Sequence, residues 1–292
     1  MTAPALSVII PVHNAADTLV EQLDSIRSAQ QAAPATEILV VDNRSTDGSA
    51  DVATEWAARH DVELRVIDAS DRAGEPFARN IGLAAARADL VVYCDADDRV
   101  ASTWLSEMAD ALRSSAYATG PIDMYDLNPA WIADVRGSSV TGESLLYDKV
   151  PYAHGCNMGF QREALRAIGG FDETYTAGCD LDIAIRMWES GHDLAYRTGA
   201  TIHYRLRHTL RETYDQGAFY GRHRVRIRRR LAEAGHVAAK DGRRLRRVLW
   251  LTRKAPVAAV RRPTRARWVW VLGQLVGELQ GERSMRRSEQ LS

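Results

Sequence analysis

The sequence has few cysteines and no pattern that would use them as a framework. Only three occur in 292 residues, at positions 94, 156 and 179, and no two of them form a Cys-x-x-Cys pair. This scarcity excludes the class of small secreted domains held by disulfides, and the spacing gives no structural zinc site. We therefore expect a protein of a reducing compartment.

Long apolar runs are also missing. The N-terminal stretch MTAPALSVIIPVHN has no basic segment ahead of its apolar residues, and it is too short for a membrane span or a signal sequence. The apolar run at 268–276 is equally short and is flanked by charge. These features predict a cytoplasmic protein without a transmembrane segment.

The net charge is zero, but the two signs are separated along the chain. Residues 1–200 carry 15 Lys and Arg against 31 Asp and Glu, whereas residues 201–292 carry 23 against 7. The acidic part indicates a site for a metal or a polar ligand, and the basic part indicates an anionic partner.

Short apolar runs alternate with helical spacing in the first part of the chain. The apolar runs, rich in Val, Ile and Leu, lie at 6–11, 37–41, 64–67 and 90–93. The stretches with helical spacing lie at 15–28, 49–60, 76–86 and 102–112. Such alternation predicts βα units and a mainly parallel sheet, which places the chain in the α/β class.

The later part of the chain is less regular. Turn residues between 120 and 152 predict an irregular excursion of the kind that often covers a site. Helices are expected again at 162–168 and in the segment CDLDIAIRMWESGHD, where Gly191 ends the helix. Arginine-rich sequence with helical spacing predicts a basic helical extension over 206–292, behind a domain of residues 1–205.

Polar residues follow three of the four predicted strands. They are His13 and Asn14, Asp42 and Asn43, and the cluster 95–98. Ligands of open α/β sheets bind at the carboxyl ends of the strands, so these groups should converge on one edge. The first turn reads PVHNAAD and lacks a Gly-x-Gly-x-x-Gly loop for a dinucleotide pyrophosphate, so a metal would have to take that role.

The acidic cluster Asp95-Ala96-Asp97-Asp98 is the strongest local signal. Crowded carboxylates repel one another, and a hard divalent cation such as Mg²⁺ or Mn²⁺ relieves that repulsion while bridging a diphosphate. The alternative is a solvated turn in which Asp98 caps the next helix. Asp42, at the end of the second strand, is placed to accept the imide N–H of a base, or else is a turn residue.

Five ordered segments resemble those of family 2 glycosyltransferases, which have the GT-A fold. The segments are SVIIPVHNAADTL, ILVVDNRSTDGS, GEPFARNIGLAAARADLVVYCDADD, NMGFQREALRAIGGFDE and CDLDIAIRMWESGH. The resemblance covers about residues 6–205 and rests on the order of motifs that are individually weak. It implies a nucleotide-sugar-binding half at about 1–115 and an acceptor-binding, catalytic half at about 116–205.

The resemblance implies a donor site at the predicted sheet edge. Asp42 corresponds to the aspartate that reads the nucleotide base. Asp95 and Asp97 correspond to the DxD pair, with Asp97 the better metal ligand and Asp95 nearer the ribose or diphosphate. His203 is a candidate third ligand, with a structural role as the alternative. The rest of the nucleotide-sugar pocket is implied at Pro11, His13, Asn14, Arg79, Asn80 and Ala96.

The resemblance also implies a catalytic base. Asp180 corresponds to the aspartate that acts as general base in inverting members. The family often has Glu-Asp where this chain has Cys179-Asp180, and losing the first carboxylate is expected to alter the pKa or the acceptor contacts of the base. Asp182 is the substitute candidate, although both aspartates suit a helix N-terminus in any case. Acceptor contacts or a structural loop role are expected for His154, Gly155 and Asn157.

The basic extension combines arginines with aromatic and aliphatic side chains. Those expected at an anionic membrane surface are Trp250, Leu251, Trp268, Trp270, Leu272 and Leu275. Acceptors of the family are often lipid-linked, which suits peripheral attachment. The alternatives are packing against the acidic part of the chain or contact with another subunit. Nucleic acid is not expected, because no recognition signature accompanies the charge.

Together these features predict an inverting, metal-dependent glycosyltransferase that uses Mn²⁺ or Mg²⁺. The donor is expected to be a UDP- or dTDP-sugar, and the acceptor a hydroxyl of a glycan or lipid-linked molecule of the cell surface. One alternative is a noncatalytic scaffold of the same fold that binds a sugar nucleotide or a membrane, which Cys179 leaves open. The other is a nucleotidyltransferase, but PVHNAADTL lacks the glycine-rich basic loop that a triphosphate needs.

Overall fold

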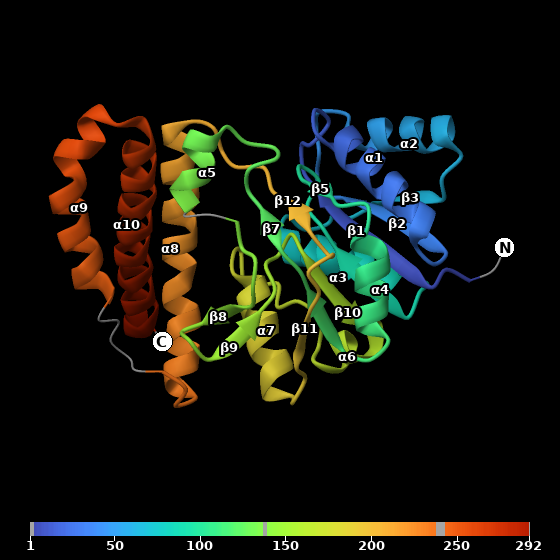
Figure 1. Cartoon of the computed structure of the whole chain (residues 1–292). Coiled ribbons are helices and arrows are strands. Elements are labelled where there is room, and N and C mark those ends of the chain that lie inside the picture. The colour runs from blue at the N-terminus through green and yellow to red at the C-terminus, as the bar shows by residue number, and fades with distance from the viewer. Residues whose placement is uncertain (1–2, 137–138, 238–242, 292) are drawn as a thin grey trace. The chain divides into compact units, whose positions relative to one another are not determined.

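The computed structural model describes residues 3–136, 139–237 and 243–291, which form two compact units (Figure 1). The first unit contains the chain up to Asp126 and again from Val140 to Arg205. The second contains Leu127–Ser139 and the chain from Leu206 onward. A short segment from the middle of the sequence therefore belongs with the C-terminal helices.

A seven-stranded sheet forms the centre of the first unit, in the order β11-β6-β10-β4-β1-β2-β3. Strands β1 to β4 are mutually parallel, whereas β10 is antiparallel to β4 and β6. These arrangements confirm the four predicted strands and the mainly parallel sheet. The strands are β1 (Leu6–Val12), β2 (Thr36–Asp42), β3 (Leu64–Asp68), β4 (Leu90–Tyr93), β6 (Tyr117–Thr119), β10 (Met158–Gln161) and β11 (Leu194–Tyr196).

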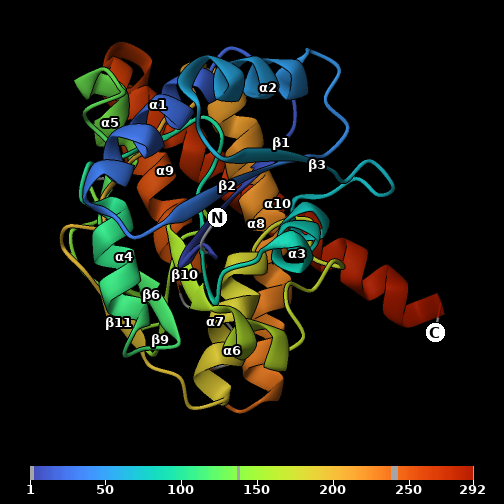
Figure 2. The ribbon, with the colours of Figure 1, turned by 90° about the vertical axis from the view of Figure 1, so that its right-hand side faces the viewer.

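Helices cover both faces of the sheet. Figure 2 shows α2 and α3 on opposite sides of β2 and β3. Every residue of β1 except Pro11 is buried, as its continuous apolar run requires. Gly82 lets α3 approach β1, because a Cβ there would lie 2.4 Å from Cγ2 of Ile9. The helices of this unit are α1 (Leu19–Ala29), η1 (Gln30–Ala32), α2 (Ser49–His60), α3 (Glu75–Ala85), α4 (Trp104–Leu112), α6 (Arg162–Ala167) and α7 (Cys179–Glu189).

Regular elements occur in the segment that the sequence predicts to be irregular. A three-stranded sheet joins β5 (Arg99–Val100), β12 (Ile202–His203) and β7 (Ile122–Asp123), and a hairpin joins β8 (Ser144–Leu146) to β9 (Val150–Tyr152). The prediction of an irregular excursion was therefore wrong in part. Strands of two or three residues carry no periodicity, so only their distant partners define them.

The second unit is helical, which confirms the predicted helical extension. It contains α5 (Ala130–Arg136), α8 (Leu210–Glu233), α9 (Arg243–Val260) and α10 (Arg262–Leu291). Helix α10 packs against the other three helices. The backbones of α8 and α10 touch, since a Cβ on Gly277 would lie 2.0 Å from the oxygen of Ala218. Within the described ranges, no helix combines the length and the apolar character that a bilayer span requires.

Two of the side chains expected at a membrane surface are buried within the helical unit. Trp270 and Leu251 are buried, and Nε1 of Trp268 donates to the oxygen of Leu251 at 2.9 Å. The expectation of interfacial contact was therefore wrong for Trp270 and Leu251. Leu251 lies where α9 packs against α10, whereas Trp270 packs against α8, where its ring contacts Tyr220.

Candidate active site

The carboxyl ends of β1 and β2 lie in register and bring two of the predicted polar groups together. Nδ1 of His13 lies 2.8 Å from the backbone oxygen of Asn43. The carboxylate of Asp42 is half-buried and accepts a hydrogen bond from the Ser45 N–H at 3.2 Å. Pro11, the next-to-last residue of β1, is half-buried. The predicted base-reading residue thus sits beside the first loop.

Asn14 shapes this edge through contacts between the two loops. Its φ of 53° is left-handed, its side-chain oxygen accepts from the Thr46 N–H at 2.8 Å, and its own N–H donates to Oγ of Ser45 at 3.0 Å. Asp47 accepts from the Ala16 N–H at 2.9 Å. These contacts hold residues 14–17 as a loop, so α1 begins at 19 and not at the predicted 15.

Asn43 is a buried structural residue of the site that the sequence did not distinguish from its polar neighbours. Its amide nitrogen donates to the oxygens of Ala69 and Arg72 at 2.5 and 2.7 Å. Its side-chain oxygen accepts from the Gly74 N–H at 2.9 Å. Asn43 therefore joins the end of β2 to the loop that leads into α3.

Arg79 is a buried cation surrounded by acceptors. Nη1 donates to Sγ of Cys179 at 3.1 Å, and Nη2 donates to the oxygen of Gly155 at 3.0 Å. Nη2 also forms ion pairs with Glu75 and, at 3.5 Å, with Oδ1 of Asp95. Burial opposes the charge, but the neighbouring negative groups raise the pKa of Arg79 above its usual value. Arg79, which is predicted to line the nucleotide pocket, thus lies at the centre of this cluster.

Asp95 is a partly exposed carboxylate of this cluster, as is Glu75. The Asp95 side chain is 31% exposed, and its backbone oxygen accepts from Nε2 of Gln22 at 2.8 Å. Loss of hydration and the nearby carboxylates, Glu75 foremost, raise the pKa of Asp95 to about 7, although Arg79 opposes the shift. A cation at this position would relieve the repulsion among the carboxylates.

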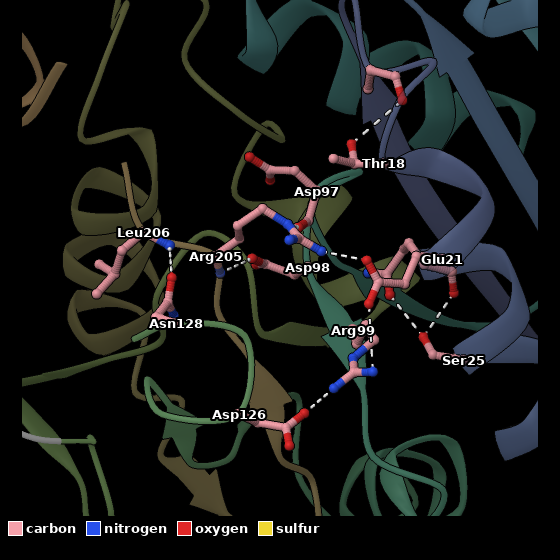
Figure 3. Close-up of polar contacts among 12 residues, drawn as sticks. Thr18, Glu21, Ser25, Asp97, Asp98, Arg99, Asp126, Asn128, Arg205 and Leu206 are labelled. Carbon is pink, nitrogen blue, oxygen red and sulfur yellow. Dashed lines mark hydrogen bonds and ion pairs between the residues drawn. The ribbon is translucent and has the colours of Figure 1, made fainter. Parts of the chain in front are cut away.

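Asp98 is buried and fixes the acidic loop to the segment after β12 (Figure 3). Oδ1 accepts from the Arg205 N–H at 2.8 Å, and Nε of Arg205 donates to the backbone oxygen of Asp97 at 2.8 Å. Arg205 also pairs with Glu21 of α1. The capping alternative for Asp98 was wrong, because Thr103 occupies the position before α4. Asp98 belongs to the acidic cluster that the sequence indicates, whereas Arg205 is a site residue that the sequence did not reveal.

Three potential metal ligands from the acidic loop and from Cys156 lie close together. One ligand atom each from Asp95, Asp98 and Cys156 lies within 4.8 Å of the others. Oδ2 of Asp98 is buried and has no hydrogen-bond partner among the residues that the structure describes. Burial raises the pKa of the Cys156 thiol, which keeps it neutral. No local pattern in the sequence points to Cys156, because its neighbours in the cluster are distant in the chain.

His203 lies in β12, the middle strand of the three-stranded sheet. The neighbouring strand β5 directly follows the acidic loop. His203 pairs with Arg99 of β5 and with Asp123 of β7. Nδ1 lies 3.0 Å from Oδ2 of Asp123 and 3.6 Å from a carboxylate oxygen of Asp126. A carboxylate at Nδ1 orients an imidazole in the way that metal-binding histidines are oriented. The role of His203 as a third ligand stays a prediction.

Asp180 is the second residue of α7, which begins at Cys179 after the left-handed Gly178. Its two carboxylate oxygens accept from the Gly155 N–H at 3.2 Å and the Leu181 N–H at 2.9 Å. Burial raises the pKa of Asp180, and the opposing effects of Arg79 and the two N–H groups do not cancel it. The carboxylate is therefore oriented by backbone donors and has more affinity for a proton than an ordinary aspartate.

Asp182 has a different environment. It is buried and accepts from Nε of Arg186, one turn along α7, at 2.7 Å. Nη1 of Arg186 in turn donates to the oxygen of Ile168. Asp182 thus belongs to an internal ion pair, which favours Asp180 as the base.

Two other residues that were predicted to contact a substrate form internal hydrogen bonds that connect distant segments of the first unit. Asn157 is buried, accepts from Nε1 of Trp104 at 2.8 Å and donates to the oxygen of Ala200 at 2.9 Å. These internal contacts of the Asn157 amide agree with the structural role, one of the two expectations for this residue. Asn80 donates to the oxygen of Phe171 and accepts from its N–H, both at 2.8 Å. Asn80 therefore positions the loop ahead of α7.

The remaining predicted residues lie around this cluster. Nε2 of His154 lies 3.0 Å from Oγ of Ser144, and its ring contacts Tyr152 of the hairpin. Ala96 is buried in the acidic loop. Gly155 joins the two halves of the cluster, since it contacts both Arg79 and Asp180.

Comparison with protein families identifies the chain. The sequence model of glycosyl transferase family 2 matches residues 7–169. The chain belongs to this family. A second model, glycosyl transferase family group 2, matches residues 90–272. The match to this second model continues beyond residue 205, into the helices of the second unit.

Curated relatives of this family 2 member are glycosyltransferases. The pre-mycofactocin glycosyltransferase of Mycobacterium tuberculosis is 29% identical over 230 residues, which cover 74% of this chain and 46% of the relative. Glycosyltransferase AglE of Haloferax volcanii is 25% identical over 199 residues, 67% of this chain and 65% of the relative. The chain spans about half the length of the first relative.

Solved structures confirm the GT-A fold of this family 2 member. The mannosyltransferase PcManGT from Pyrobaculum calidifontis, in complex with GDP-Man and Mn²⁺, superposes with a TM-score of 0.65 at 20% identity, over 96% of this chain and 88% of that one. Glucosyl-3-phosphoglycerate synthase from Mycobacterium tuberculosis, in complex with Mn²⁺, UDP and its product, gives 0.56 at 20% identity, over 82% of each chain.

Proposed function

We propose that this chain is an inverting glycosyltransferase that moves a sugar from a nucleotide-diphosphate sugar to a hydroxyl of a glycan or lipid-linked acceptor, in the synthesis of a cell-surface polysaccharide or glycolipid. One observation carries the proposal. The buried guanidinium of Arg79 contacts Asp95 on one side and, through Gly155, the loop that holds Asp180 on the other. The groups expected to serve the donor and the acceptor therefore belong to one cluster.

The donor nucleotide is proposed to bind at the ends of β1 and β2. Asp42 would accept the imide N–H of uracil or thymine, which favours a UDP- or dTDP-sugar. The loop contacts of His13 and Asn14 would fix the shape of the pocket around it. Binding at the carboxyl ends of the strands agrees with the general rule for open α/β sheets.

Mn²⁺ or Mg²⁺ is the proposed cofactor, with Asp97 and Asp95 as ligands and His203 as a third. The donor set fits a hard cation, because carboxylates crowd at Asp95 and a buried oxygen of Asp98 has no partner among the described residues. Two of the solved neighbours contain Mn²⁺. A bound cation supplies positive charge that stabilises the diphosphate leaving group.

Asp180 is the proposed general base. The N–H groups of Gly155 and Leu181 hold its carboxylate in place. Asp180 accepts the proton of the acceptor hydroxyl while that oxygen forms a bond to the anomeric carbon, and the bond from this carbon to the diphosphate oxygen breaks on the opposite side. Attack from the face opposite the leaving group inverts the configuration.

Thermal shifts with UDP-, dTDP- and GDP-sugars, each with and without Mn²⁺ or Mg²⁺, test donor binding. A ligand that binds only the folded state stabilises it by about 2.7 kcal/mol at a hundred times its dissociation constant. We expect a metal-dependent shift that Asp97→Ala loses. The matched control is Asp110→Ala, an exposed aspartate of α4, which should keep the shift. No shift with any donor would contradict the proposed donor site and favour a noncatalytic scaffold.

Peripheral attachment to the inner face of the cell membrane is proposed for the second unit. Its high content of arginine and the lipid-linked class of acceptor support this attachment. The membrane partner is independent of the donor chemistry and requires its own test.

A further inference from the structure

Helix α9 packs against α10 with one face only. Arg244 lies 3.1 Å from Glu282, and Arg247 lies 2.7 Å from Glu278. Leu251, one turn further, is buried. These positions recur every three or four residues, so they define the inner face of α9. Figure 1 shows α9 and α8 on opposite sides of α10.

The opposite face of α9 exposes apolar side chains. Leu245 is 66% exposed, Leu249 is 52% exposed and Val260 is 79% exposed. At about 100° of rotation per residue, these positions lie together on the side away from Arg247 and Leu251. This apolar line consists of large side chains that the helical unit itself does not cover.

Basic residues flank the apolar line. Arg246 and Arg253 are exposed on the same helix. The α9 segment RRLRRVLWLTRKAPVAAV contains neither Asp nor Glu. We call Leu245, Leu249, Val260, Arg246 and Arg253 the outer face of α9. It combines an apolar line with cations and no acidic side chain.

We propose that the outer face of α9 docks on a bilayer that contains anionic phospholipids. The proposal deepens the membrane attachment proposed above and replaces the side chains that the sequence suggested. An amphipathic basic helix binds such an interface by burying its apolar side chains among the acyl chains and placing its cations at the headgroups. A nucleic acid would neutralise the cations but leave Leu245 and Leu249 in water, so a lipid surface fits both features.

The test is co-sedimentation of the full chain with vesicles, without donor or metal. One set contains phosphatidylcholine alone, and the other contains phosphatidylcholine with phosphatidylglycerol. We expect binding to the second set only, and binding that falls as salt is raised. If the chain does not sediment with the anionic vesicles, the proposal is overturned. Binding to a DNA duplex instead would assign the cations to a nucleic acid.

Two double variants locate the contact. L245S/L249S should lower the partition coefficient onto anionic vesicles on the order of tenfold, because two leucines that enter the bilayer interface are lost. R246Q/R253Q should lower it by a similar factor at low salt, since each cation near an anionic surface contributes. Circular dichroism and the melting temperature establish that the variants are folded.

Matched controls carry the same changes elsewhere. L145S/L210S removes two exposed leucines, and R59Q/R113Q removes two exposed arginines outside α9. Both controls should bind like the wild type. Wild-type binding by the α9 variants, or an equal loss in the controls, would refute the outer face of α9 as the contact. The result does not depend on donor binding, so it is distinguishable from failure of the proposed function.

Discussion

Nη1 of Arg79 lies 3.1 Å from Sγ of Cys179, so a thiol accepts a hydrogen bond where the family often has a carboxylate. Burial raises the pKa of this thiol and keeps it neutral. Arg79 therefore forms its ion pairs with Glu75 and Asp95, and its charge also opposes the rise in the pKa of Asp180. The neighbour of Asp180 in the sequence is thus a neutral group, and no carboxylate at position 179 shares the charge of Arg79.

Removing the acceptor at position 179 should destabilise the protein. Cys179→Ala leaves one N–H of the buried Arg79 without its partner, and we expect the free energy of unfolding to fall by about 1 to 3 kcal/mol. Cys179→Ser keeps an acceptor oxygen and should lose less. Urea denaturation measures both values. Equal losses in the two variants would show that the hydrogen bond is not the cause.

Asp180→Asn should reduce turnover more than donor binding. A positioned base contributes roughly 10² to 10⁴ in rate, whereas the variant keeps the donor residues intact. Steady-state kinetics and the donor-dependent thermal shift measure the two effects. Asp182→Asn is the comparison, because it breaks the pair with Arg186 and should lower stability while the folded enzyme still turns over. If Asp182→Asn loses as much turnover, Asp182 is the base.

Turnover should depend on pH through Asp180. Its raised pKa means that the base is protonated, and inactive, at pH values where an ordinary aspartate with a pKa of 3.8 is still ionised. We therefore expect kcat to fall on acidification at a pH clearly above 3.8. A pH profile of kcat, with circular dichroism to establish folding, gives the measurement. Full activity down to the ordinary aspartate range would contradict the assignment.

Glu37 should make stability dependent on pH. Burial alone would raise the pKa of Glu37, but hydrogen bonds from Ser7, the Arg87 N–H and Arg65 outweigh it and lower the pKa below 4.5. Its stabilisation is thus complete above the unfolded value of 4.5 and is lost as pH falls through the folded value. Glu37→Gln should cost about 1 to 3 kcal/mol at neutral pH. Its unfolding free energy, measured in urea, should vary less with acid than that of the wild type.

Gly277→Ala should weaken the contact between α8 and α10. The added Cβ would lie 2.0 Å from the backbone oxygen of Ala218, and backbone cannot move aside as a side chain can. Overpacking of this kind costs about 1 to 3 kcal/mol. Gly142→Ala is the control, because its Cβ would meet nothing within 4 Å. A thermal melt of the full chain should show a lower midpoint for Gly277→Ala only.

Long periodic segments made most of the first unit predictable from sequence. The apolar runs of β1 and β2 and the helical spacing of α2 carry their structure in local pattern, and their bounds agree to within about two residues. The two-residue strands β5, β7 and β12 have no such pattern, because pairing between distant segments creates them. Trp270 is a similar case. Its side chain is of a type that suits a membrane interface, but packing against a second helix buries it.

The candidate site was predictable in its residue types but not in its contacts. Asp95 and Asp180 could be named from motifs, because each stands at the end or the start of an element. Burial of Arg79, Asp98 and Asn157 follows from tertiary packing that a local pattern does not encode. Arg205 escaped notice because its partners, Asp98 and Glu21, are distant in the sequence.

The place of α5 in the second unit has a consequence for synthesis. Ribosomes make the chain from the N-terminus, so α5 emerges long before α10, the helix against which it packs. The guanidinium of Arg262 lies 3.9 Å from the ring centroid of Trp131, a contact that must wait until the last helix has been translated. A nascent chain that ends after β12 therefore presents the Trp131 indole to the solvent and to chaperones.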